Sequence, residues 1–209
     1  MKRAGTIGIA VAVSLMFGTP SADCQISGLT VAPELIEARY CANRSGALEL
    51  RAEVQFTYQN TSKGVIILPL FAQVVEYSLF ADKEALMANR SDGQWRSEVR
   101  RLFDERKLNQ SRPGEDLFHL LAPGDSQSLR LSIFVPLLPP SRRGIKLLGT
   151  DQYLRVEINQ WFGNRRLGED LQRRWRDVGL LWIDNVMAEP LKLHIEEDPP
   201  RRACPVRVD

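Results

Sequence analysis

Apolar and polar residues alternate without interruption from Leu48 to Tyr58. Every second residue is apolar, and the residues between them are Glu, Arg, Gln or Thr. Because successive side chains of a strand point to opposite faces, this period of two predicts a strand with one buried face. We place the strand at 47–60, where it reaches the turn-forming residues Asn60-Thr61-Ser62-Lys63-Gly64.

Several other segments have strand character, through alternation or through β-branched and aromatic residues bounded by turns. Prolines are expected to end two of them, since proline cannot donate to a strand ladder. Pro69 follows one segment, and Pro136 follows another, which Ala122-Pro123-Gly124-Asp125 introduces as a turn. The predicted strands are 26–31, 65–68, 71–80, 128–135, 153–162, 178–183 and 191–195.

Two segments repeat apolar residues at helical spacing instead. The first, Gln94 to Leu108, contains Trp95, Val99 and Leu102, and Asp92 could cap its start. The second runs from Leu167 to Trp175, with an apolar residue every fourth position. We predict both as helical insertions.

Many short strands with no regular strand–helix alternation predict a mainly β protein, an antiparallel β-sandwich. The strand–turn–strand pattern from Leu48 to Phe80, with the Pro-Gly-Asp turn before Ser128, resembles bacterial immunoglobulin-like domains. The resemblance covers about half of the chain and implies an architecture without assigning functional residues.

The N-terminus has the pattern of a secretory signal peptide. Lys2 and Arg3 precede an apolar run at 7–17, and Ser21 and Ala22 supply small residues for cleavage. The run is shorter than the roughly 18 residues that a membrane-spanning helix needs. We therefore expect a leader at 1–22, one mature domain at 23–209, a periplasmic or secreted location, and no transmembrane segment after leader removal. An uncleaved anchor or a buried N-terminal helix is the alternative.

Removal of the leader changes the charge balance. The chain has 28 Lys and Arg against 26 Asp and Glu, and the leader takes two basic residues with it. The mature domain is then neutral by this count, so composition gives no reason to expect a nucleic-acid partner.

Three cysteines remain after the leader: Cys24, Cys41 and Cys204. Export permits one intramolecular disulfide and leaves one thiol over. Proximity favours Cys24 with Cys41, and the alternative joins either of them to Cys204. Asp23 precedes Cys24 where lipid attachment would need a small residue, which argues against a lipoprotein.

One basic segment is the candidate binding site for a protein or an envelope glycan, because arginines interleaved with aromatic side chains can bind anionic groups. The alternative interpretation is a solvated loop whose tryptophans plug the core and whose arginines are neutralised by Glu169, Asp170 and Asp177. The candidate residues are Trp161, Arg165, Arg166, Arg173, Arg174 and Trp175.

No pattern of residues predicts an active site, a metal site or a cofactor. His119 and His194 lack partners at ligand spacing, and the paired acids are adjacent in sequence, which points them in different directions. Four N-x-S/T triplets, at Asn43, Asn60, Asn89 and Asn109, would be glycan acceptors in a eukaryotic secretory pathway.

These observations favour an exported, non-enzymatic binding or assembly module of the cell envelope. One alternative is a secreted hydrolase whose site is built from distant residues. Another is a periplasmic chaperone or pilus-like component that acts by strand addition, which would require an accessible edge strand.

Overall fold

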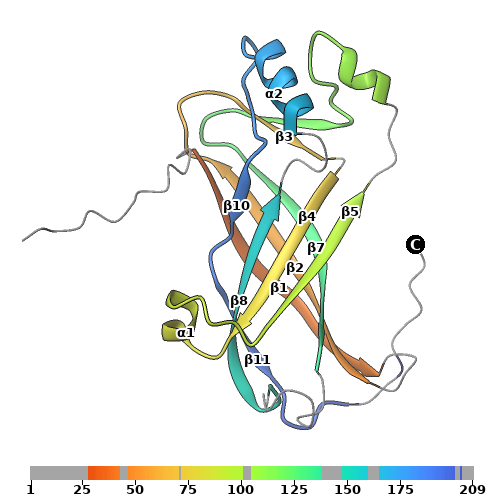
Figure 1. Ribbon diagram of the computed structural model, residues 1–209, viewed down its shortest axis with the longest axis vertical. Coiled ribbons are helices and arrows are strands. Elements are labelled where there is room, and N and C mark those ends of the chain that lie inside the picture. Colours follow the sequence, from red (N-terminus) through yellow and green to blue (C-terminus); the bar gives the residue numbers. More distant parts are fainter. Residues whose placement is uncertain are drawn as a thin grey trace, which may run out of the picture.

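The computed structural model describes residues 28–42, 47–70, 72–100, 105–137, 147–159, 165–200 and 203. It confirms a mainly β protein with antiparallel sheets. Two sheets lie one in front of the other, and a smaller sheet with two short helical elements covers one end (Figure 1). The immunoglobulin-like arrangement remains a prediction.

The first sheet contains three antiparallel strands in the order β1-β2-β7, namely Leu29–Ala42, Leu48–Asn60 and Ser126–Pro136. The central strand, β2, is the one with uninterrupted alternation, and its buried residues are the apolar set. β1 is an edge strand with a register shift between Leu35 and Glu37.

The second sheet is four strands wide. Its order is β10-β8-β4-β5, with bounds Asn185–Met187, Thr150–Asn159, Ala72–Phe80 and Gly93–Arg100. β11, Leu191–Ile195, pairs with the other half of β8 on the side of β10. The short helix α1, Lys83–Met87, links β4 to β5 and begins at Asp82, whose carboxylate accepts a hydrogen bond from the Ala85 amide.

The two sheets share one hydrophobic core. Alternate residues of β2 and β7 pack with alternate residues of β4 and β8. The Tyr77 hydroxyl crosses between the layers, donating to the Phe134 carbonyl at 2.9 Å and accepting from the Phe134 amide at 3.2 Å. Among the fully buried side chains are Leu50, Phe56, Tyr58, Leu79, Ile133 and Leu154.

A second, smaller core lies under the cap at the end of the molecule. The cap sheet has the order β6-β3-β9, with bounds Phe118–Leu121, Ile66–Pro69 and Leu180–Leu181, and β3 pairs with β9 in parallel. The 3-10 helix η1, Glu105–Asn109, and helix α2, Arg165–Arg174, add Leu108 and Leu171 to this core.

Asn60 joins the cap to the first sheet, and its side chain is fully buried. Its Nδ2 donates to the carbonyls of Gly64 and Leu121, each at 2.8 Å, and its Oδ1 accepts from the amide and hydroxyl of Ser62. The Asn60 amide also donates to the carbonyl of Asp125. Through its side chain and its backbone, Asn60 thus fixes the end of β2 against the turn before β3, the end of β6 and the connection from β6 to β7.

The predicted helix from Gln94 to Leu108 is wrong. Residues 93–100 form β5, and among the described residues of this segment the helical ones belong to the 3-10 helix Glu105–Asn109. A spacing of four fits a strand face as well as a helix face, and the pairing of Trp95 with Tyr77 selects the strand. Asp92 accordingly caps no helix; that role belongs to Asp82.

Other predictions differ only in their bounds. β1 runs far beyond the predicted 26–31, and Pro69 is the last residue of β3 instead of the residue after it. The helix predicted at 167–175 is confirmed as α2, and the alternation predicted in β7 and β8 is confirmed by their burial.

We expect Asn60→Ala to lower the free energy of unfolding by about 2 kcal/mol or more, because it removes the buried hydrogen bond to the Leu121 carbonyl and the bonds that hold the 61–64 turn. Urea unfolding followed by tryptophan fluorescence measures this change. Gln59→Ala is the matched control, since Gln59 is exposed on the same strand. Equal stability of the two variants would contradict the role assigned to Asn60.

Candidate functional site

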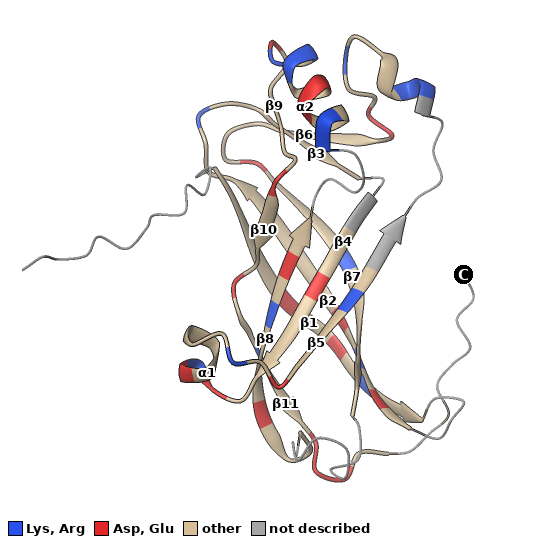
Figure 2. Cartoon of the chain, viewed as in Figure 1, with Lys and Arg blue, Asp and Glu red and all other residues tan. Residues whose placement is uncertain are grey.

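The predicted basic segment lies in the cap, where Lys and Arg gather on α2 and η1 (Figure 2). The helix turns Leu171 toward the small core and keeps Arg165, Arg166, Arg173 and Arg174 exposed. Trp161 lies outside the described residues. The described arginines of the prediction therefore do share one surface.

Trp175 is not part of that surface, because its side chain is fully buried. Its ring meets Phe118 edge-on, with centroids 4.8 Å apart, and its Nε1 donates to the Gln110 carbonyl at 3.1 Å. Trp175 therefore packs in the small core, as the alternative interpretation of the basic segment predicted. Trp175 is thus unavailable to a ligand at the surface.

Three of these arginines, Arg165, Arg173 and Arg174, form ion pairs or hydrogen bonds with acidic side chains or a backbone carbonyl. Arg165 contacts Asp184 at 3.0 Å and Glu169 at 3.2 Å, and these hydrogen bonds raise its pKa. Arg173 pairs with Asp170, and Arg174 donates to the Leu108 carbonyl at 2.8 Å. The basic cap is consequently closer to a solvated, neutralised surface than to a concentrated anion site.

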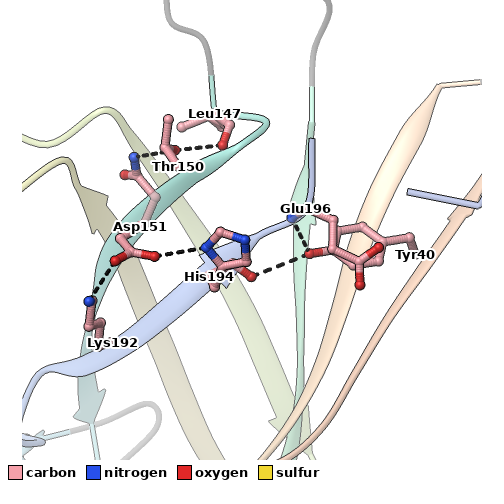
Figure 3. A network of polar contacts seen from close by, with 8 residues as sticks. Tyr40, Leu147, Thr150, Asp151, Lys192, His194 and Glu196 are labelled. Atoms are coloured by element: carbon pink, nitrogen blue, oxygen red, sulfur yellow. Dashed lines mark hydrogen bonds and ion pairs between the residues drawn. The ribbon is translucent and has the colours of Figure 1, made fainter. Parts of the chain in front are cut away.

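A polar network lies on the paired strands β8 and β11 (Figure 3). His194 Nδ1 is 2.8 Å from one oxygen of Asp151, and Lys192 Nζ is 2.5 Å from the other. The Tyr40 hydroxyl accepts from the Glu196 amide at 2.8 Å, which connects β1 to the residue after β11. The network therefore ties both sheets together at this side of the molecule.

The His194–Asp151 contact has the form of a catalytic base with its orienting acid. Both side chains are about half exposed or more, at 66% and 48%. The prediction that His194 is a strand residue facing solvent is confirmed by this placement. The contacts of the network join β8 to β11 and β11 to β1, so we assign the network a structural role (Figure 3).

A groove of about 490 Å³ lies between the edges of β7 and β5. Trp95 stacks on Tyr77 along one wall, with ring centroids 6.0 Å apart. Across the groove, the Arg51 guanidinium lies over the Phe134 ring, 5.3 Å from its centroid. Arg96, Ser97, Glu49 and Pro136 complete the lining.

The sequence alone did not predict this groove, because its lining comes from four strands. The apolar spacing predicts a helix at Trp95 and an ordinary strand at Phe134. One signal in the sequence does point to the groove. Phe134 is an aromatic residue on the face of the predicted strand that otherwise carries the polar residues Ser128, Arg130 and Ser132.

A second hollow, of about 550 Å³, lies in the cap between the 62–65 turn and the end of α2. Gln172, Arg176 and residues 177–180 line it, and its lining includes no aromatic residue. The Val65 carbonyl approaches so closely that a Cβ on Gly179 would lie 2.6 Å from it. This hollow lies beside the parallel pairing of β3 with β9 and lacks the aromatic walls of the groove.

Two sequence candidates have structural roles. His119 lies in β6, half-buried, and pairs in register with Leu68. Asn60 cannot accept a glycan in the folded protein, because its side chain is fully buried and both Nδ2 hydrogen bonds are used. Asn89 and Asn109 are exposed, and Asn43 lies outside the described residues.

Within the described residues, no cluster of His, Cys, Asp or Glu could hold a metal ion. No helix in that part of the chain is long and apolar enough to cross a membrane. No protein-family model matches the chain, and no curated protein is similar to it. The groove between β5 and β7 is therefore chosen as the candidate site on its geometry.

Hydrogen bonds from Lys192 and His194 lower the pKa of Asp151. The stabilisation this gives is present above the unfolded-state pKa and is lost as the pH falls through the lower folded-state value. We expect Lys192→Gln to raise the Asp151 pKa toward its unperturbed value of about 3.9. NMR titration of the Asp151 carboxyl carbon measures this pKa. Lys63→Gln, in the distant 61–64 turn, is the control and should leave the Asp151 pKa unchanged.

Proposed function

We propose that this chain is an exported, non-enzymatic binding or assembly module of the cell envelope, and that it binds a protein partner in the groove between β5 and β7. Its fold would be an immunoglobulin-like sandwich. The observation that carries the proposal is the groove itself, which places Trp95 and Phe134 beside a sheet edge. Aromatic and arginine side chains are the residues most enriched at protein interfaces.

The electrostatics of the groove fit a protein better than an anionic glycan. Arg51 lies 3.8 Å from Glu49, and Arg96 lies 4.0 Å from Glu76, so both cations have acids close by. A highly charged polymer would gain little from such a balanced surface. An apolar side chain of a partner would gain contact with the aromatic rings.

Photocrosslinking in the producing cells tests the proposal. A benzoylphenylalanine residue replaces Ser97 in the groove, Arg173 in the basic cap, or Met87 on α1, which is 88% exposed. We expect one discrete protein adduct in the envelope fraction from position 97 and none from position 87. Adducts from position 173 alone would move the binding site to the cap and contradict the groove.

We also propose that Cys41 forms a disulfide with Cys204, the alternative to Cys24 that the sequence left open. Two observations support it. Cys41 is 3% exposed, and Ala42 forms a parallel bridge with Ala203, the residue before Cys204. Such a bond would hold the C-terminal tail against the β1–β2 hairpin.

Peptide mapping of the purified mature protein without reductant tests both export and pairing. We expect an N-terminus at Ala22 or Asp23 and a linked peptide that contains Cys41 and Cys204. A disulfide stabilises mainly by restricting the unfolded chain, so Cys41→Ala should lower the free energy of unfolding by about 2–4 kcal/mol. A mature chain that begins at Met1 would contradict export.

A further inference from the structure

We infer that the groove accepts an extended polypeptide segment as a fourth strand of the first sheet, paired with the free edge of β7. This inference rests on the proposed function and names the form in which the partner binds. It follows from the unequal widths of the two sheets and from the hydrogen-bonding groups that β7 presents.

The first sheet is three strands wide and the second is four. β5 forms the outer edge of the wider sheet, and its residues Trp95 and Ser97 line the groove beside the edge of β7. Trp95 and Ser97 lie on the same face of β5 as the core-facing side of its partner β4, and both remain half-exposed. A strand added beside β7 would cover them.

β7 presents unused backbone groups along that edge. Leu137 donates to the Leu48 carbonyl, so odd-numbered residues of β7 face β2 and even-numbered residues face outward. The Tyr77 hydroxyl occupies both groups of Phe134. The amides and carbonyls of Arg130 and Ser132 face the same way and have no partner among the described residues.

β1, the other edge of this sheet, is protected against strand addition. Its Val31 carbonyl accepts from the Glu189 amide, and Pro33 lacks a donor on the same side. A register shift follows at Leu35 to Glu37. Prolines, bulges and charges are the usual means of blocking an edge, and β7 has none of them from Ser126 to Ser132 except the single charge of Arg130.

These features define the chemistry of the occupant. Residues of the added strand that point inward would meet Trp95 and Tyr77 and should be apolar at every second position. Residues that point outward would continue the row of Ser128, Arg130 and Ser132, so an acidic residue opposite Arg130 would make a favourable cross-strand pair. Backbone hydrogen bonds would provide affinity and the alternating side chains specificity.

The free edge of β5 is the competing position, because Gln94 and Arg96 direct their backbone groups outward, away from β4. A strand added there would extend the wider sheet further and would cover no core-facing side chain. A strand added to β7 buries the exposed part of Trp95 between two layers. The apolar area buried therefore favours β7.

The test selects ten-residue peptides from a displayed library on the full mature chain and measures the affinity of the selected peptide by fluorescence anisotropy. Ser132→Pro removes one outward amide without touching the β2 ladder, as Pro136 already does on the same edge. We expect it to weaken binding roughly tenfold or more, while Ser132→Ala binds like the parent. Far-ultraviolet circular dichroism checks that both variants keep the fold.

The outcomes separate this inference from the proposed function. Selected peptides that bind Ser132→Pro as well as Ser132→Ala, or that lose affinity only in Gln94→Pro, which removes an outward amide of β5, would overturn pairing with β7. A failure to select any alternating peptide would overturn it too. If the crosslink from position 97 persists in Ser132→Pro cells, the groove still binds a protein, but not as an added strand. If that crosslink is absent from the parent, the proposed function itself fails.

Discussion

Two antiparallel sheets of unequal width bury one shared set of apolar side chains, and this mismatch shapes the rest of the molecule. Where strands face each other, alternate residues of both layers are fully buried. Where the wider sheet extends past the narrower one, a groove with aromatic walls remains at the edge of β7. Tyr77 marks the boundary between these regions, since its ring packs in the core and its hydroxyl satisfies the last backbone groups of the edge.

The sequence predicted the strands whose two faces differ most. β2, β7 and β8 alternate because one face meets the core and the other meets water, and their patterns could be read directly. The helix predicted at β5 is wrong because this edge strand has polar residues on both faces, including two arginines. The difference in hydrophobicity between its two faces is therefore small, and the period of two is hard to recognise. β1 was underestimated because residues 32–39 are mostly exposed and a register shift interrupts the period. The groove could not be predicted, because Arg51, Tyr77, Trp95 and Phe134 come together only through sheet pairing and layer packing.

The basic segment shows why a run of charges is weak evidence for a site. Its arginines have hydrogen-bonding partners on the same helix, in the residue before β10 and on η1. Its one described tryptophan supports the cap from inside instead of facing a ligand. Surface ion pairs of this kind contribute little to stability, so the cap is held mainly by its small apolar core and by the hydrogen bonds of Asn60.

The parallel pairing of β3 with β9 brings together residues that are more than a hundred positions apart. Loops of this length must be closed before the contact contributes any free energy, so such pairings form slowly and late. Until β9 arrives, Ile66 and Ile67 of β3 lack one of their two neighbours, and the small core under the cap is open to solvent. A chain that folds while it emerges would therefore complete the cap only after its final quarter is free, and its half-finished form would be the state most prone to aggregation or in need of a holding chaperone.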